Sequence, residues 1–250
     1  MQHKNIQQNG SEKWDQCRAL LFDKDGTIIN FRLMWLGWCR EIINALEITY
    51  SATLVEKNLS AWGVDLALGH IAPDGYLAIG TTKELQHSLA GRLSAEGFAT
   101  DKTEADVYAA MQHAYHAVEE KKMIRAIPGV DTTIRELQNR GYLLAIVTTD
   151  DTQKATDNLR TMGLESSFKL VLGCDRVANC KPAPDLTLEA CRLLGVKPAE
   201  AAVIGDTLAD VRMGKAAGAA CCIGVASGVT TPESLAKEAD LVLESVAHLI

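Results

Sequence analysis

The sequence predicts an α/β protein built on a doubly wound parallel sheet, with an all-helical segment inserted after the first strand. Over residues 17–29 and 128–250, short apolar runs alternate with amphipathic stretches of helical length. This alternation is typical of parallel strands that helices cover on both faces. Residues 30–127 contain no convincing strand run, and their apolar residues recur at helical spacing. A chain of 250 residues is long enough for one large domain or two small ones.

Six apolar runs are the expected strands of this sheet. In chain order they are residues 18–22, 142–147, 169–172, 201–204, 220–225 and 240–243. Residues 129–141 and 183–195 are amphipathic and end on glycine, the residue most common just after a helix. Sheets of this kind bind ligands beyond the carboxyl ends of their strands. The residues that follow each strand are therefore the first candidates for function.

The boundaries of these patterns divide the chain into three parts. We expect a flexible N-terminal tail over residues 1–16, because this stretch is polar and lacks the apolar region of a signal peptide. The α/β core domain should comprise residues 17–29 and 128–250, and the helical domain residues 30–127.

Composition excludes several classes of function. Twenty-five Lys and Arg against 32 Asp and Glu give 25 − 32 = −7, so a basic surface for nucleic acid is not expected. No stretch approaches the roughly 20 apolar residues that cross a membrane. Seven cysteines without a CxxC pair indicate reduced core thiols in a cytoplasmic protein, without a zinc site or disulfide framework.

The strongest sign of chemistry is the run Asp-Lys-Asp-Gly-Thr at residues 23–27, directly after the first expected strand. Two carboxylates two residues apart at a strand end can point into one crevice, which favours a catalytic site. An ordinary Asp-Gly turn explains the run equally well when it is considered alone. Alternation along the strand predicts that Lys24 points away from the crevice shared by Asp23 and Asp25.

Three further polar runs follow later strands. Residues 148–150 (Thr-Thr-Asp) and 205–210 (Gly-Asp-Thr-Leu-Ala-Asp) come after strands, and residues 181–185 (Lys-Pro-Ala-Pro-Asp) precede a helix. Each run alone has a structural explanation as a helix cap or helix start. Asp206 and Asp210 are four residues apart, so one helical turn would bring them to the same side. Four such runs at strand ends are hard to explain by capping alone.

In their order, these four runs resemble the motifs of the haloacid dehalogenase-like (HAD) superfamily of phosphohydrolases. Residues 224–240 resemble the phosphoglycolate-phosphatase-like branch, as does a helical insertion between the first two motifs. The resemblance implies a Rossmann-like core and a helical cap domain over residues 30–127. It also implies hydrolysis of a small phosphate monoester, with phosphoglycolate as the leading substrate.

The resemblance also implies residue roles. Asp23 would be the nucleophile that becomes an aspartyl phosphate, and Asp25 the general acid and base. Mg²⁺ would be bound by Asp23, the Asp25 backbone carbonyl and Asp206. The resemblance further implies contact with the substrate phosphate by Thr148, Thr149, Lys181 and Gly26, of which Thr148 and Lys181 would also be catalytic. Asp210 would support the metal ligands or orient Lys181. Thr27 would be a supporting residue that, with Gly26, shapes the loop. Four acidic groups against one lysine make a divalent cation necessary, because a phosphate dianion would otherwise be repelled.

Alternatives remain within and outside this family. The same fold supports sugar-phosphate mutases and phosphonate hydrolases, and a non-catalytic binding module is a further reading that the complete motif set disfavours. Thr149 stands where these phosphatases often have Asn, so we expect an altered substrate contact. The second acid, Asp25, favours phosphate over halide chemistry. The expected partner is a small phosphorylated metabolite.

Overall fold

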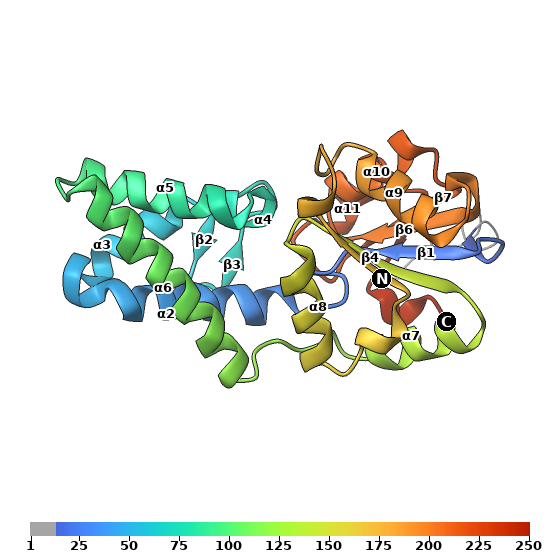
Figure 1. Ribbon diagram of the computed structural model, residues 1–250, viewed down its shortest axis with the longest axis horizontal. Coiled ribbons are helices and arrows are strands. Elements are labelled where there is room, and N and C mark those ends of the chain that lie inside the picture. The colour runs from blue at the N-terminus through green and yellow to red at the C-terminus, as the bar shows by residue number, and fades with distance from the viewer. Residues whose placement is uncertain (1–13) are drawn as a thin grey trace, which may run out of the picture. The chain divides into compact units, whose positions relative to one another are not determined.

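The computed structural model describes residues 14–250, which form two compact units (Figure 1). The α/β unit comprises the chain up to Asn30 together with Ala126–Ile250, and the helical unit comprises Phe31–Arg125. None of the helices within residues 14–250 combines the length and apolar composition needed to cross a membrane.

The α/β unit contains a six-stranded parallel sheet in the order β5-β4-β1-β6-β7-β8. The strands are β1 (Ala19–Phe22), β4 (Leu143–Thr148), β5 (Leu170–Gly173), β6 (Ala201–Gly205), β7 (Cys221–Val225) and β8 (Leu241–Leu243). All six expected runs form strands, so the predicted parallel sheet is confirmed. The central strand β1 has β4 on one side and β6 on the other, and the chain order of the strands reverses there. Ligands bind at such a reversal point.

Helices cover both faces of the sheet, as Figure 1 shows with α7 below the strands and α9 and α10 above them. Alternate residues of β1 supply the two cores because side chains alternate along a strand. Leu20 and Phe22 pack with apolar side chains of α7 and α8, whereas Ala19 and Leu21 pack with those of α9 and α10. The helices are α7 (Val130–Asn139), α8 (Thr152–Thr161), α9 (Asp185–Leu194), α10 (Leu208–Ala217) and α11 (Pro232–Leu235).

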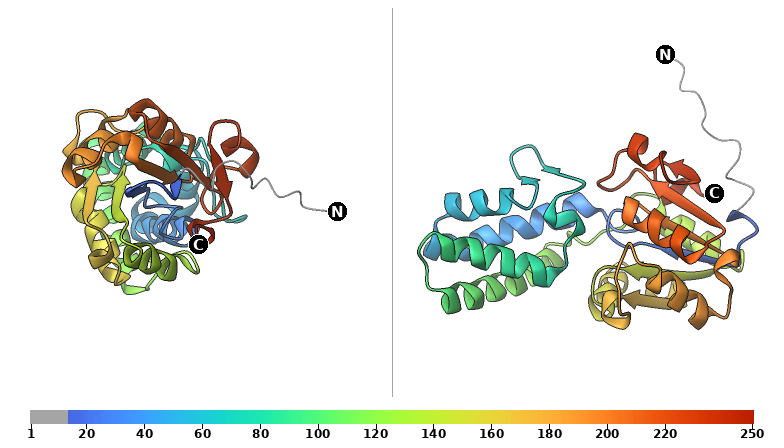
Figure 2. Two further views of the ribbon diagram at one scale, coloured as in Figure 1. Left: turned by 90° about the vertical axis from the view of Figure 1, so that its right-hand side faces the viewer. Right: turned by 90° about the horizontal axis from the view of Figure 1, so that it is seen from above.

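In the helical unit, α2, α5 and α6 run side by side (Figures 1 and 2). Their apolar faces enclose a core that includes Trp62, which is fully buried. A capping box between Thr81 and Glu84 begins α5. The helices are α2 (Phe31–Tyr50), α3 (Ala52–Ser60), α4 (Tyr76–Ile79), α5 (Thr82–Ala95) and α6 (Thr100–Glu120).

The expectation of an all-helical insertion is wrong in one place. Two short antiparallel strands, β2 (Val64–Asp65) and β3 (His70–Ile71), form a hairpin within the helical unit. The Asp65 carboxylate accepts a hydrogen bond from the Leu68 backbone N–H at 2.9 Å and stabilises the turn. Strands of two residues are too short to show the alternation by which a sequence indicates a strand.

The expected flexible N-terminal tail does not include Trp14. Residues 1–13 of the expected tail lie outside the described residues, and Trp14 is already buried and packs near Tyr142.

The expectation that every cysteine is a reduced core thiol is wrong for Cys174 and Cys180, which form a disulfide. The loop after β5 turns back and brings their Cα atoms to 5.4 Å, within the range that a disulfide spans. Five other cysteines are buried thiols.

Candidate active site

Three neighbouring strands place the predicted motif residues at one edge of the sheet. Asp23 follows β1, Thr148 ends β4 and Asp206 follows β6. Because these strands are parallel and adjacent, their carboxyl ends lie together. The Asp23 backbone N–H donates to the Ile204 carbonyl at 2.8 Å, which extends the pairing of β1 and β6 to the first motif.

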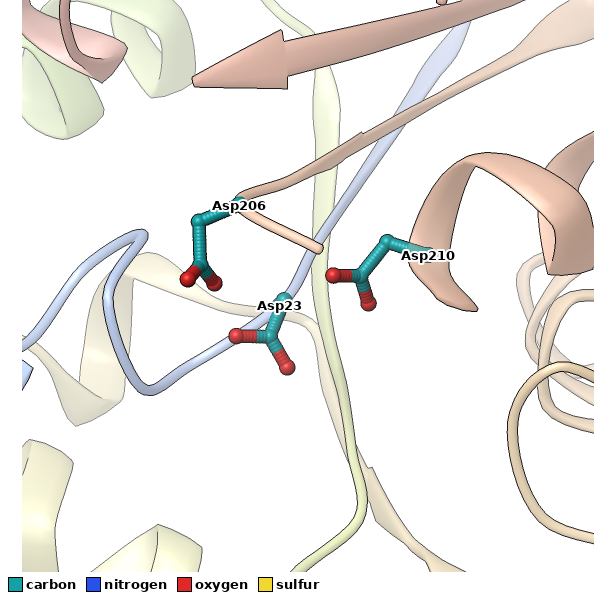
Figure 3. Close-up of side chains that lie close together, drawn as sticks. All are labelled: Asp23, Asp206 and Asp210. Atoms are coloured by element: carbon teal, nitrogen blue, oxygen red, sulfur yellow. The ribbon is translucent and has the colours of Figure 1, made fainter. Parts of the chain in front are cut away.

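Three carboxylates gather at this edge. Oxygens of Asp23, Asp206 and Asp210 lie within 4.8 Å of one another, and Figure 3 shows the three side chains close together. All three residues are buried. Asp210 lies in the first turn of α10, where its Oδ2 accepts hydrogen bonds from the Thr207 backbone N–H and hydroxyl. This capping box fixes Asp210 over the end of β6.

Lys181 joins two of these carboxylates. Its Nζ lies 2.5 Å from Asp23 Oδ1 and 2.6 Å from Asp210 Oδ1, and its side chain is 3% exposed. Lys181 comes from the loop before α9, so the structure brings together residues 158 positions apart in the chain. Asp210, expected to support the metal ligands or to orient Lys181, is buried like Asp23 and contacts Lys181.

The charges of this cluster do not balance. Burial raises the pKa of Asp23 to about 7, against the opposing effect of Lys181, and Asp210 and Asp25 raise it further. Burial, Asp23 and Asp210 also raise the pKa of Asp206 well above its ordinary value. Burial lowers the pKa of Lys181, but Asp210 and Asp23 reverse this effect, so its pKa lies above the ordinary value. Three buried carboxylates facing one ammonium form an oxygen donor set that fits a hard divalent cation.

Glycines allow the chain to approach Asp206 closely. Gly26 has φ +88°, and a Cβ there would lie 2.6 Å from Asp206 Cγ, so only glycine fits. Thr27 Oγ1 donates to Asp206 Oδ1 at 3.4 Å. The supporting role expected for Thr27 stays a prediction.

Sequence reasoning missed the loop after β7. The Val229 backbone N–H donates to Asp206 Oδ2 at 3.0 Å, and a Cβ on Gly228 would collide with the same carboxylate. Ser227 Oγ donates to the Gly26 carbonyl at 2.7 Å. The residues Ser227 and Gly228 carried no signal beyond their resemblance to the phosphoglycolate-phosphatase-like branch.

The two threonines of the second motif differ. Thr148 is buried, and its Oγ1 accepts a hydrogen bond from the Asp150 backbone N–H at 3.2 Å. Thr149 is exposed. Only Thr148 is therefore fixed at the strand end in this structure.

The predicted orientation of Lys24 is wrong. Lys24 is fully buried, and its Nζ lies 2.8 Å from Asp25 Oδ2 and 3.2 Å from Asp150 Oδ2. The backbone N–H groups of Ile28 and Ile29 both donate to the Lys24 carbonyl, so the chain turns there and strand alternation no longer applies. The Asp25 carboxylate is not among the three clustered acids. Its expected metal contact was through the backbone carbonyl, which stays a prediction.

Comparison with known proteins agrees with this geometry. Residues 17–218 match the family model of haloacid dehalogenase-like hydrolases. The chain is 29% identical to the pyrophosphatase PpaX of Listeria monocytogenes over 93% of this chain and 94% of that protein. It is 28% identical to a plasmid-encoded phosphoglycolate phosphatase of Cupriavidus necator over 93% of this chain and 91% of that protein.

A solved structure shares the fold. The crystal structure of a predicted phosphoglycolate phosphatase from Haemophilus somnus 129PT has a TM-score of 0.69 at 21% identity, covering 93% of this chain and 96% of that one. The family-model match covers most of the chain, from the first motif through the fourth. This chain therefore belongs to the haloacid dehalogenase-like hydrolases and is a phosphatase of that family.

Proposed function

We propose that this phosphatase hydrolyses a small phosphate monoester with Mg²⁺, through a phosphorylated Asp23. The observation that carries the proposal is the Asp23 carboxylate, held by Lys181 at the end of β1 beside Asp206 and Asp210. Phosphoglycolate is the leading substrate, which the name of the Cupriavidus necator relative supports.

In the first step, a carboxylate oxygen of Asp23 attacks phosphorus and the bond between phosphorus and the ester oxygen breaks. Asp25 gives its proton to the leaving alkoxide. In the second step, Asp25 takes a proton from water, the water oxygen attacks phosphorus, and Asp23 is released with inorganic phosphate. General acid–base catalysis of this kind contributes on the order of 10²–10⁴-fold to a rate.

The buried acids supply ligands for the cation. Asp23 and Asp206, with the Asp25 backbone carbonyl, would hold Mg²⁺, and Asp210 keeps Lys181 against Asp23. When bound, the cation offsets repulsion between a phosphate dianion and the carboxylates, roughly 4 kcal/mol per charge pair at 4 Å and an effective dielectric of 20. The phosphoryl oxygens would be held by Thr148, Lys181, Thr149 and Gly26.

The helical unit would act as the cap that selects the substrate. It is inserted between β1 and β4, the strands that carry the first two motifs. The acidic cluster found among the described residues lies wholly outside it. A cytoplasmic location is part of this proposal, because five of the seven cysteines are buried thiols and a single disulfide, Cys174–Cys180, is formed among the described residues.

Phosphate release from a panel of phosphorylated metabolites tests the proposal. The panel should contain phosphoglycolate, sugar phosphates and pyrophosphate, each with Mg²⁺ and with excess chelator. We expect Mg²⁺-dependent release from a monoester. Release only from pyrophosphate would refute the monoester assignment, and full turnover in chelator would refute the metal requirement. Conversion of a sugar phosphate into its isomer without free phosphate would identify a mutase instead.

A further inference from the structure

A second buried ionic cluster lies beside the first at the same sheet edge. It consists of Lys24 and Asp25 after β1 and Asp150 after β4. The side chain of Lys24 is 0% exposed, and those of Asp25 and Asp150 are 15% and 10% exposed. The proposed chemistry uses Asp25 but has no role for the other two residues.

We propose that Lys24 is a positioning residue that holds the Asp25 carboxylate in place for proton transfer, with Asp150 as its anchor. This inference rests on the proposed function, because it assigns Asp25 the acid–base role. The Lys24 ammonium bridges Asp25 Oδ2 at 2.8 Å and Asp150 Oδ2 at 3.2 Å, so the position of one carboxylate depends on the other.

Asp150 is suited to be the anchor because several contacts fix it. Its Oδ1 accepts a hydrogen bond from the Asp151 backbone N–H at 2.9 Å. Its own backbone N–H donates to Thr148 Oγ1, and its carbonyl accepts from the Cys174 backbone N–H. Asp150 is thereby tied to the ends of both β4 and β5. The bridge through Lys24 transfers this rigidity to the turn that carries Asp25.

The charge of Lys24 matters more than its bulk. Methionine has a similar length and would fill much of the same buried volume. Without the ammonium, however, two carboxylates that now share one cation would repel each other in a poorly hydrated site. Asp25, which lies on a turn, would then move from its place. A general acid must lie within hydrogen-bond reach of the leaving oxygen, so a shift of about 1 Å can cost ~10²-fold.

The test separates positioning from a purely structural role by the leaving group. An alkyl phosphate needs the proton of Asp25 for its basic alkoxide to leave, whereas an aryl phosphate with an acidic phenol does not. Single-turnover release of alcohol and of phenol should be measured with Mg²⁺ for the wild type, Lys24→Met, Lys24→Arg and Asp150→Asn. Lys169→Met removes an exposed lysine from the position just before β5 and serves as the matched control.

We expect Lys24→Met to slow alcohol release by ~10²-fold and phenol release by less than about threefold. Lys24→Arg should recover part of the alcohol release. Asp150→Asn should also slow alcohol release more than phenol release, but by a smaller factor than Lys24→Met. Lys169→Met should release both products at the wild-type rate. The ratio of the two rates does not depend on the folded fraction. If Lys24→Met does not fold, the difference between the losses of alcohol and phenol release in Asp150→Asn tests the proposal instead.

Equal losses on both substrates, or no loss on either, would overturn the role of Lys24 while leaving the proposed function intact. A wild-type protein that releases neither alcohol nor phenol would instead refute the proposed function, and this inference with it.

Discussion

The α/β unit and the helical unit bury polar side chains in different ways. In the helical unit, the buried Asn58 and Thr103 side chains donate to backbone carbonyls of their own helices, at 2.9 and 2.8 Å. Glu41 pairs with Lys121, an exposed residue just after α6. These contacts complete hydrogen bonds within a helical bundle and bring no reactive groups together.

The α/β unit instead concentrates buried charge at the ends of its strands. Asp23, Lys24, Asp206 and Asp210 are all buried at the carboxyl edge of one sheet. Burying charge is costly unless the groups pair or bind a metal. A fold that places so many ionisable groups together, and raises the pKa of Asp23 and of Asp206, favours chemistry at this edge of the sheet. This difference supports the proposal that the chemistry takes place in the α/β unit. Substrate selection by the helical unit is a separate proposal.

The largest effect should come from removing one acid of the cluster. Asp206→Asn keeps the shape of the side chain but removes the charge that would bind the cation, so turnover should fall to near background even in millimolar Mg²⁺. Steady-state phosphate release checks this, with Asp131→Asn, an exposed aspartate in the first turn of α7, as control. Recovery of full activity at high Mg²⁺ would contradict the assignment of Asp206.

Substitution of Lys181 should give the next largest loss of turnover. Lys181→Met removes the ammonium that contacts Asp23 and Asp210, and with it the proposed contact to the phosphoryl oxygens. Loss of one such charge-stabilising donor costs roughly 10²–10³-fold in kcat. The loss should appear with alkyl and aryl phosphates alike, unlike that of Lys24→Met. A loss confined to alkyl phosphates would place Lys181 with Asp25 and not with the phosphate.

The pH should have a smaller effect, on how much Mg²⁺ stabilises the folded protein. The pKa of Asp23 is about 7 in the folded protein against an ordinary 3.8. Between these values the folded protein keeps a proton that the unfolded chain has released, so metal-free stability falls as pH rises from about 4 to about 7. A bound cation relieves this loss. The rise in Tm on adding Mg²⁺ should therefore be larger at pH 7.5 than at pH 5, as measured by calorimetry. An equal rise in Tm at both pH values would contradict the excess of buried carboxylates over Lys181 in the metal-free site.

The smallest effect on turnover should come from the helical unit. Trp62→Ala removes a fully buried ring and should destabilise that unit by roughly 3–5 kcal/mol. The rate on a small aryl phosphate should stay within about threefold of the wild type, because the reacting groups lie in the other unit, while the preference among metabolites should weaken. Substrate competition assays below the Tm of the variant measure this. A variant with the wild-type order of substrates would argue against substrate selection by the helical unit.

The sheet and its motif residues were predictable because strands in a parallel sheet are local apolar runs. The carboxyl ends of parallel strands lie at one edge of the sheet, so the grouping of Asp23, Thr148 and Asp206 at the ends of β1, β4 and β6 follows from the sequence pattern. The resemblance implied that Asp210 either supports the metal ligands or orients Lys181, and in the structure Asp210 contacts Lys181.

The missed features all depend on turns or on distant contacts. Lys24 departs from strand alternation because the chain turns immediately after β1. The contact of Val229 with Asp206 joins residues 23 positions apart through a backbone N–H, which side-chain identity does not reveal. The Cys174–Cys180 disulfide likewise depends on the path of one loop. A sequence pattern indicates elements well, but it carries little information about how loops close over them.

The central claim is that Asp23 carries a covalent phosphate, which Asp25 helps both to form and to remove. Asp25→Ala, mixed with an aryl phosphate and Mg²⁺, tests this most directly in a rapid-quench experiment. An acidic phenol leaves without the acid, whereas hydrolysis of the phosphorylated Asp23 lacks its base and becomes rate-limiting. The account predicts a burst of phenol close to one equivalent per active site, slow turnover afterwards, and phosphate on Asp23 in the quenched protein. Equal losses on alkyl and aryl phosphates, with no burst and no phosphate on Asp23, would contradict it.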